Sequence, residues 1–247
     1  MNEIENIKLT NVTTTYEGAD TPVIHNVNLS INRGEFIIIG GQNGSGKTTL
    51  LETIAGLLPI VTGSVKIDGE NIKKSKTLRK KLGYVIQNFA FDAFTPFTVE
   101  EVILMARYGQ LGILKYPRDD DHAAVDEVIS LLKLNQLRTR KIGKLSGGQQ
   151  QRVLIAHNLA KKPNILLLDE PFSNLDLVSR EQVCNILCNL ADSGITIIIV
   201  SHAFDVLPDR DIRAVVMKNG RIIFDSKLPS SSVAEIVRHL SLDEKYV

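Results

Sequence analysis

A glycine-rich loop between a hydrophobic run and a helix restricts the fold of this chain more than any other feature. The segment GGQNGSGKTT, residues 40–49, follows FIIIG and leads into GKTTLLETIAGLL, whose apolar residues recur at helical spacing. Gly41, Gly46, Lys47 and Thr48 fit the pattern Gly-x-x-x-x-Gly-Lys-Ser/Thr. In this pattern the glycines let consecutive backbone N–H groups surround phosphate oxygens at a helix N-terminus. The loop therefore predicts a strand, a nucleotide phosphate site and a helix, in that order.

The residues of the loop divide the work of binding ATP. Lys47 is placed to reach the β- and γ-phosphates, and the Thr48 hydroxyl is placed to ligate Mg²⁺. A glycine-rich turn without a ligand is the alternative, and the strand–loop–helix context argues against it. We expect every residue of the loop to contribute to the ATP site: Gly41, Gln42, Asn43, Gly44, Ser45, Gly46, Lys47, Thr48 and Thr49.

A second hydrophobic run, ILLLDEP, ends in two acids. A buried strand here would deliver Asp169 to its carboxyl end, the edge at which ligands bind in open α/β sheets. We predict that Asp169 holds Mg²⁺ through water, and that Glu170 polarises a water for attack on the γ-phosphate. Acids after a strand are weak evidence alone. Together with the phosphate loop they predict hydrolysis of ATP.

Short β-branched runs elsewhere in the chain predict its fold class. Several are apolar throughout, which is typical of parallel strands covered on both faces. Between Phe89 and Lys162 no convincing strand appears, and the apolar spacing is helical. We predict an α/β fold: a P-loop NTPase (RecA-like) core with a mostly parallel buried sheet, an N-terminal antiparallel β subdomain and an inserted α-helical subdomain over 89–162, all in one domain over 1–247. We expect a helix over 46–58 and strands over 7–12, 27–31, 35–40, 63–69, 82–87, 164–171, 194–201, 212–217 and 221–225.

Composition excludes several classes of protein. Lys and Arg total 29 against 28 Asp and Glu, a balance that argues against nucleic-acid binding and leads us to expect no polybasic membrane-binding segment. The N-terminus is polar, and apolar runs are far shorter than the roughly 20 residues of a spanning helix. We therefore expect a soluble, cytoplasmic chain. Cys184 and Cys188 lack further metal-ligating neighbours, so we expect both to pack as small apolar residues.

The segment KLSGGQQQRVLIA, residues 144–156, predicts a second phosphate-binding helix. Ser146 is a good N-cap, and Gln149 completes a capping box. Gly147 and Gly148 cost the helix roughly 1–2 kcal/mol relative to alanine, but leave its first N–H groups uncovered for an anion. An ordinary capped helix is the alternative. Because the chain has one phosphate loop, we expect the spare helix to serve the ATP of a second copy in a two-fold dimer.

These motifs give the chain a resemblance to the ATP-binding-cassette (ABC) ATPases over nearly its whole length. LSGGQQQR looks like the signature motif of that family, which implies a homodimer with two ATP molecules sandwiched between the chains. The resemblance assigns contacts with the partner chain's ATP to five residues: Leu145, Ser146, Gly147, Gly148 and Gln149.

The same resemblance implies roles for four further residues. Tyr16 is similar to the aromatic residue that stacks on adenine, and Gln87 to the glutamine that contacts Mg²⁺ and the attacking water. Asp176 lies in SNLD, which resembles a loop that crosses the dimer interface. His202 resembles the histidine that senses the γ-phosphate and assists Glu170. For Tyr16, Gln87 and His202 the alternatives are a surface aromatic, a plain loop residue and a structural histidine.

Two positions depart from the pattern of the family. Gln42 stands where proline is common, and Ala203 follows His202 where an acid is common. Both flank the motifs and leave the expectation of ATP binding unchanged.

The resemblance also implies which process ATP hydrolysis drives. In the family, dimer closure on ATP moves a coupling helix of a membrane subunit, docked beside the segment after Gln87. This chain has no spanning segment, so its permease subunits are expected to be separate polypeptides, as in importers, with an extracellular substrate-binding protein. We expect the chain on the inner face of the cell membrane.

The segment after Gln87 indicates the class of importer. Four phenylalanines lie within residues 89–97, where they either pack inside the insertion or form a docking surface. The pattern VILMARYGQLG resembles ATPases of manganese, zinc and iron importers, and less closely those for iron chelates and vitamin B12. The alternatives are an ABC exporter subunit and a soluble ABC ATPase of iron–sulfur cluster assembly.

Overall fold

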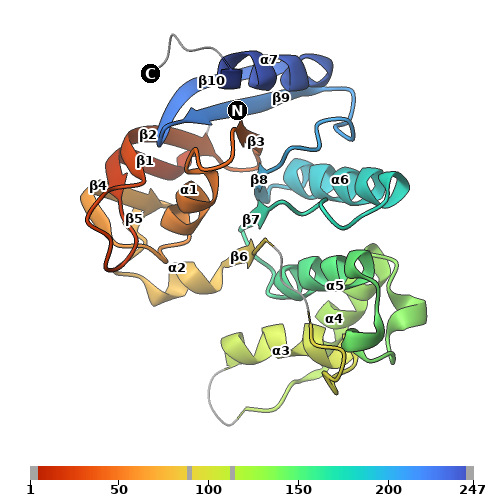
Figure 1. The fold of residues 1–247 in the computed structure, drawn as a ribbon. Helices are drawn as coiled ribbons and strands as arrows, with labels where there is room; N and C mark the ends of the chain where they lie inside the picture. Colours follow the sequence, from red (N-terminus) through yellow and green to blue (C-terminus); the bar gives the residue numbers. More distant parts are fainter. Residues whose placement is uncertain (1–4, 88–90, 112–114, 243–247) are drawn as a thin grey trace.

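A computed structural model describes residues 5–87, 91–111 and 115–242. Two sheets organise it (Figure 1). The smaller sheet is antiparallel in the order β2-β1-β4-β5, built from β1 (Glu5–Thr14), β2 (Ile24–Asn32), β4 (Ile60–Ile67) and β5 (Glu70–Asn71). It corresponds to the antiparallel β subdomain that the sequence predicted.

The larger sheet has the order β10-β9-β3-β8-β7-β6. Its neighbours pair in parallel from β9 to β6, and β10 is the antiparallel edge strand. The mostly parallel core that the sequence predicted is confirmed. The strands are β3 (Phe36–Gly41), β6 (Leu82–Val85), β7 (Ile165–Asp169), β8 (Thr196–Val200), β9 (Asp211–Lys218) and β10 (Arg221–Pro229).

Helices cover both faces of this sheet. α1 (Lys47–Ile54) follows the glycine loop, and α2 (Lys76–Lys80) precedes β6. Three helices lie together at the lower end of the molecule in Figure 1: α3 (Val99–Leu111), α4 (Asp119–Leu131) and α5 (Gly147–Ala160). The two remaining helices are α6 (Leu177–Asp192) and α7 (Ser230–Leu242).

The stretch expected to form a helical insertion has helices α3 to α5 and two short 3-10 helices, Asn135–Leu137 and Ile142–Lys144. Within its described residues the only strand-like pairing is one isolated bridge, between Thr98 and Lys141. Its division from the rest of the chain as a subdomain stays a prediction.

Alternating side chains of the central strands separate the two larger clusters of the core. Ile38, Ile197 and Ile199 belong to one cluster, with the helices of the insertion and α6. Ile37 and Ile39 belong to the other, with α1 and the antiparallel sheet. The apolar runs are therefore buried on both faces because each face is covered by a different layer.

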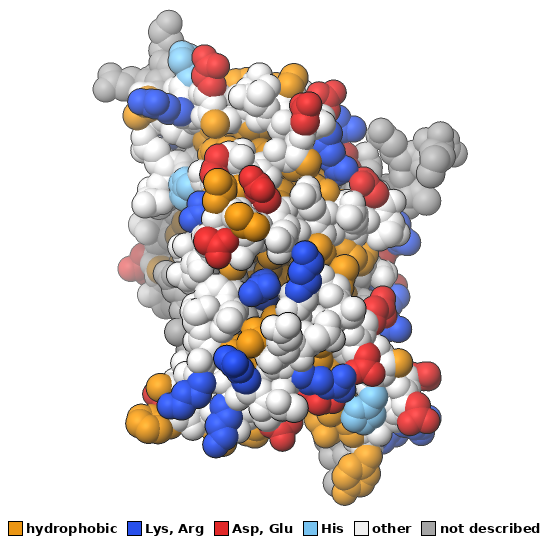
Figure 2. Space-filling model, turned by 90° about the vertical axis from the view of Figure 1, so that its right-hand side faces the viewer, with side chains coloured by type: hydrophobic (Ala, Val, Ile, Leu, Met, Phe, Trp, Pro, Cys, Tyr) orange, Lys and Arg blue, Asp and Glu red, His pale blue; other side chains and the backbone are white. Residues whose placement is uncertain are grey.

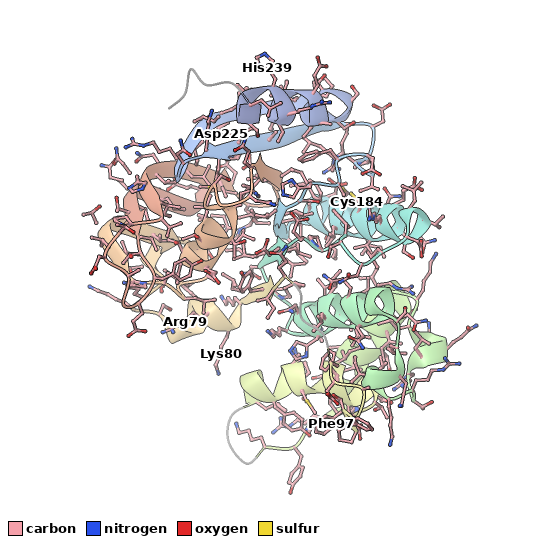
Figure 3. All side chains as sticks on the ribbon, viewed as in Figure 1. Arg79, Lys80, Phe97, Cys184, Asp225 and His239 are labelled. Carbon is pink, nitrogen blue, oxygen red and sulfur yellow. The ribbon has the colours of Figure 1, made fainter. Side chains whose placement is uncertain are left out.

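Several elements end earlier than the sequence suggested. The helix expected to reach residue 58 ends at Ile54, because Gly56 has a φ of 72° and Pro59 follows shortly. The strand expected over 63–69 ends at Ile67, since Asp68 and Gly69 both take left-handed backbone angles in the turn to β5. Helix α6 carries Cys184, labelled in Figure 3, and Cys188, and both are buried in the core as expected.

Candidate ATP-binding and hydrolysis site

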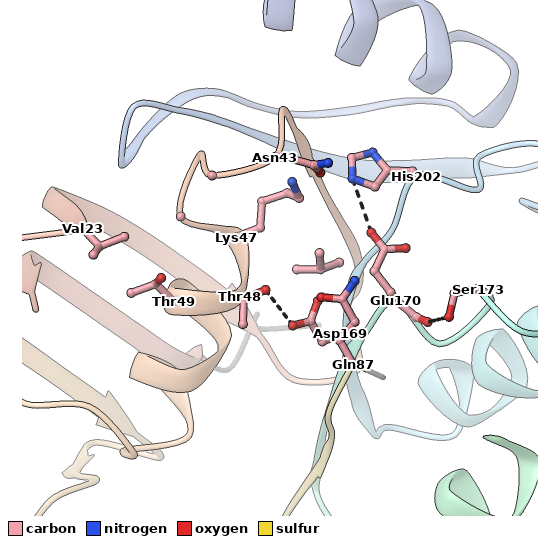
Figure 4. Close-up of a pocket in the computed structure, with 13 residues that line it drawn as sticks. Val23, Asn43, Lys47, Thr48, Thr49, Gln87, Asp169, Glu170, Ser173 and His202 are labelled. Carbon is pink, nitrogen blue, oxygen red and sulfur yellow. Dashed lines mark hydrogen bonds and ion pairs between the residues drawn. The ribbon is translucent and has the colours of Figure 1, made fainter. Parts of the chain in front are cut away.

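A cavity of about 560 Å³ opens where β3, β7 and β8 end. Figure 4 shows the side chains that converge there from segments distant in sequence. The strand ends bring the glycine loop, the acidic pair and the histidine to one edge of the sheet, as the sequence predicted. The lining residues are Val23, Asn43, Gly44, Gly46, Lys47, Thr48, Thr49, Gln87, Asp169, Glu170, Ser173, Val200 and His202.

The backbone of the loop needs its glycines. Gly41 has a φ of 138°, and a Cβ there would overlap the carbonyl oxygen of Met217 on β9. Gly46 caps α1 with a φ of 97°. Both angles lie in the region that side chains rarely adopt. The loop is therefore held close against β9 at the N-terminus of α1.

Lys47 points into the loop from the first position of α1. Its ammonium donates hydrogen bonds to the carbonyl oxygens of Gly41, at 2.9 Å, and Gln42, at 2.8 Å. Burial lowers the pKa of Lys47, while the carboxylates of Glu170 and Asp169 oppose that shift. A buried cation among exposed loop N–H groups is the arrangement that binds the phosphates of a nucleotide.

Thr48 and Asp169 meet across the cavity. The Thr48 hydroxyl donates a 2.7 Å hydrogen bond to Oδ2 of Asp169 (Figure 4). The other oxygen, Oδ1, is buried without a hydrogen-bond partner among the described residues. Burial is also the main cause of the raised pKa of Asp169. The Thr48 hydroxyl, the Gln87 amide oxygen and the unsatisfied oxygen of Asp169 are hard oxygen ligands of the kind that Mg²⁺ prefers. These three residues therefore fit that ion.

Glu170 stands beside His202. Oε1 of Glu170 lies 3.5 Å from Nε2 of His202 (Figure 4). The Glu170 backbone takes a left-handed φ of 49°, and its N–H donates to the carbonyl of Val200 at 2.9 Å. A left-handed glutamate costs about 1 kcal/mol, so the surrounding fold imposes this turn. Burial raises the pKa of Glu170 and lowers that of His202.

Three residues outside the predicted set line the cavity, and four residues of the predicted ATP site do not. Gln87 lines the cavity, but Tyr16 is not part of its lining. The Tyr16 hydroxyl instead donates to a carboxylate oxygen of Glu52 at 2.9 Å and lies 3.2 Å from the Thr49 hydroxyl. Val23, Ser173 and Val200 were missed, because an isolated valine carries no functional signal in a sequence and only Asp176 of the SNLD segment was assigned a role.

Three other loop residues lie around the cavity without lining it. Ser45, Gly41 and Gln42 fall outside its lining, although Gly44 and Gly46 between and beside them line it. The Gln42 side chain donates a 2.8 Å hydrogen bond to the carbonyl oxygen of Ser241 on α7. Ser45 is buried, and its hydroxyl has no partner among the described residues.

The signature segment begins α5 with the expected capping box. Ser146 Oγ accepts from the Gln149 N–H at 3.3 Å, and Oε1 of Gln149 accepts from the Ser146 N–H at 3.1 Å. None of the five residues from Leu145 to Gln149 lines the cavity of the same chain. The N-terminus of this helix therefore does not border the ATP cavity of its own chain.

The second glycine of the signature segment, Gly148, is required by a packing contact that the sequence did not show. A Cβ at Gly148 would lie 2.7 Å from the carbonyl oxygen of Asn174, in the loop after β7. The same loop ends at Asp176, which caps α6 by accepting from the Ser179 N–H at 2.8 Å. The contact between these two loops fixes the distance between the signature segment and the end of β7, where Asp169 and Glu170 lie.

A second cavity, of about 440 Å³, lies between β6 and α3. We call it the β6–α3 groove. Its lining is mainly apolar, with a polar end at His157, Asn158 and Lys161. The phenylalanines expected here divide: Phe91 and Phe97 line the groove, Phe94 is 88% exposed, and Phe89 lies outside the described residues. The full lining is Tyr84, Val85, Ile86, Phe91, Thr95, Phe97, Val102, Met105, Leu154, His157, Asn158 and Lys161.

Gln150, directly after the signature segment, connects the groove to it. Its side-chain oxygen accepts from the Phe91 N–H at 3.1 Å. Its amide nitrogen donates to the carbonyls of Ile142, at 3.2 Å, and Leu145, at 3.3 Å. One buried side chain thus joins a wall of the groove to the residue that precedes Ser146.

The described part of the chain has no helix long and apolar enough to cross a bilayer. The same residues contain no group of three or more His, Cys, Asp or Glu side chains arranged to hold a metal ion.

Comparison with known proteins gives a consistent set of relatives. The family model described as "ABC transporter" matches residues 24–173. The manganese transport system ATP-binding protein MntB of Bacillus subtilis is 35% identical, over 82% of this chain and 79% of its own. The zinc transport system ATP-binding protein TroB of Treponema pallidum is 35% identical, over 88% and 80%. The phosphonates import ATP-binding protein PhnC 2 of a Nostoc species is 33% identical, over 94% and 98%.

Solved structures agree with this set. A bacterial ABC transporter cassette solved as a dimer is 32% identical and superposes with a TM-score of 0.76, over 90% of this chain and 98% of that one. The same cassette has been solved in a post-hydrolysis state bound to ADP and phosphate.

Proposed function

The chain belongs to the ABC transporter family as an ATP-hydrolysing subunit, and we propose that it powers a membrane importer for metal ions such as manganese, zinc or iron. The observation that carries the proposal is the meeting of three features in one chain. These are the phosphate loop with the acids Asp169 and Glu170, the signature helix that does not border the cavity of its own chain, and the β6–α3 groove.

We assign the chemistry of the site as follows. The loop N–H groups and Lys47 bind the phosphates of ATP. Thr48, Asp169 and Gln87 would hold Mg²⁺, which supplies charge neutralisation at the β- and γ-phosphates. Glu170 accepts a proton from the attacking water as general base, and His202, 3.5 Å away, orients the carboxylate and contacts the γ-phosphate. Tyr16 would reach adenine only after its hydrogen bonds to α1 rearrange.

The partner of this chain is proposed to be a second copy. The signature helix N-terminus lies outside the chain's own cavity, and a relative at 32% identity has been solved as a dimer. A two-fold arrangement lets residues 145–149 of each copy close the ATP site of the other. The loop that contains Asp176 contacts the signature segment at Gly148, so it would lie at the same interface.

The β6–α3 groove is the proposed docking site for a separate permease subunit. It is apolar and open, with exposed side chains of Ile86, Phe97 and Met105 along it. These suit the apolar face of a short helix, a common form of helix recognition. Gln150 would transmit movement of the groove wall to the signature helix. The chain would therefore lie peripherally on the inner face of the cell membrane.

A charge in the groove is expected to uncouple the ATPase from its permease. Met105 is 39% exposed and lies outside the catalytic cavity. We predict that Met105→Glu leaves ATP hydrolysis by the purified chain unchanged. We also predict that it abolishes co-purification with the permease from detergent-solubilised membranes, because a carboxylate there must be buried without a partner.

The matched control is Leu242→Glu, at an exposed position on α7 remote from the groove. It should leave both hydrolysis and co-purification intact. Retention of the permease by Met105→Glu at the level of this control would place the docking site elsewhere.

The cargo is tested in cells. Cargo specificity belongs to the permease and to an extracellular substrate-binding protein, the third proposed component. Deletion of the gene for this chain should lower the cellular content of one of manganese, zinc or iron in metal-poor medium, measured by mass spectrometry. Unchanged contents of all three, with impaired phosphonate uptake, would favour the class of import represented by PhnC 2.

A further inference from the structure

A dense run of cations covers α2 and the turn before it. Residues 73–81 read KKSKTLRKK, with six Lys or Arg and no acid, in a chain whose net charge is +1. The near balance of the charge totals conceals this segment, and no polybasic membrane-binding segment was expected from them. We call residues 73–81 the basic segment.

The basic segment is anchored by one apolar side chain. Leu78 is 7% exposed and belongs to the core cluster that contains Ile72 and Leu82. Five cations of the segment are exposed and, among the described residues, their side chains form no ion pair or hydrogen bond. They are therefore available to an external partner. The exposed cations are Lys73, Lys74, Arg79, Lys80 and Lys81.

The position of the basic segment restricts that partner. Lys81 directly precedes β6, and the groove lining begins at Tyr84. Figure 3 shows Arg79 and Lys80 projecting from α2 beside β6, on the side where α3 begins the lower part of the molecule. If a permease docks in the β6–α3 groove, as proposed above, the basic segment lies next to it and close to the membrane surface.

The rest of the surface in view is different. Figure 2 shows the side of the molecule turned away from α2, where both signs of charge are present and Lys and Arg are denser over the lower half. Opposite charges that lie close together largely cancel over a Debye length of about 8 Å at physiological ionic strength. The basic segment has no acid within it to cancel its field.

We propose that the basic segment binds the phosphates of anionic lipid headgroups in the leaflet around the permease. Flexible ammonium and guanidinium groups spread along nine residues suit a plane of phosphates better than one enclosed anion. With a single apolar side chain, already buried, the segment rests on the headgroups and does not insert. Its attraction orients the ATPase so that the groove faces the permease.

The test uses the purified full chain and sedimentation with phosphatidylcholine vesicles, with and without phosphatidylglycerol. We expect binding only to vesicles that contain phosphatidylglycerol, with loss at high salt. Combined Arg79→Gln, Lys80→Gln and Lys81→Gln should weaken binding by about tenfold or more. The control combines Arg221→Gln, Lys227→Gln and Arg238→Gln, three exposed cations on β10 and α7, and should bind like the parent.

Other outcomes overturn the inference. The lipid site is overturned if the two triple variants bind vesicles equally well. It is also overturned if the parental chain binds equally well to vesicles without phosphatidylglycerol. Displacement by inorganic phosphate, at an ionic strength where sodium chloride has no effect, identifies a soluble anion site instead. ATP hydrolysis by both variants at the parental rate confirms that they fold.

Co-purification with the permease distinguishes this inference from the proposed function. In neutral detergent without anionic lipid, the Arg79, Lys80 and Lys81 variant should still co-purify with the permease. Its loss there would assign the basic segment to an acidic protein surface. Failure of the parental chain to capture any permease, with charge-dependent vesicle binding preserved, would overturn the proposed function alone.

Discussion

Glu170→Gln is expected to lower ATP hydrolysis by a factor of about 10²–10⁴, the usual contribution of a general base. The carboxylate lies at the wall of the ATP cavity beside His202, and glutamine has nearly the same shape but accepts protons poorly. ATP binding should persist, because the loop and Lys47 are unchanged. Two chains should then remain closed on ATP and appear as a stable dimer in size-exclusion chromatography.

Glu181→Gln is the matched control, since it makes the same change on the exposed surface of α6. It should hydrolyse ATP at the parental rate and form no trapped dimer. If Glu170→Gln behaves in the same way as this control, Glu170 is not the base.

Ser146→Arg is expected to abolish hydrolysis while a single chain still binds ATP. Ser146 caps α5 outside the cavity of its own chain, so the new side chain blocks only a site completed by a second copy. Fluorescence titration with an ATP analogue at low protein concentration measures binding to the monomer. Steady-state phosphate release at high concentration measures hydrolysis by the dimer.

Ser146→Ala separates the two effects of that change. It removes the N-cap, at a cost of about 1 kcal/mol in helix stability, without adding bulk. Its dimer should still close on ATP. Loss of ATP binding by the Ser146→Arg monomer would contradict a site shared between chains, because the substitution would then act within one chain.

The parts of the site encoded by short local patterns were predictable from sequence. The phosphate loop, the acids after β7 and the capping box at Ser146 each follow from neighbours within a few residues. The parallel sheet brings its strand ends together, which is why Lys47, Asp169 and His202 meet as expected.

Contacts between distant segments were not predictable in this way. The approach of Asn174 to Gly148 and the link from Gln150 to Phe91 depend on how loops pack, which no local pattern records. The placement of Tyr16 against Glu52 is of the same kind. By contrast, the cap at Asp176 could have been found from the sequence. An Asp directly before a helix is a preferred N-cap, and it accepts here from the N–H of Ser179, three residues later.

The central claim is that this ATPase powers a membrane importer, and its partners test it most directly. The tagged chain is captured from detergent-solubilised native membranes, and the co-purifying proteins are identified by mass spectrometry. We predict a multi-spanning permease subunit together with an extracellular metal-binding protein. Recovery of soluble proteins alone, such as iron–sulfur assembly factors, would contradict the claim and place the work of the ATPase away from the membrane.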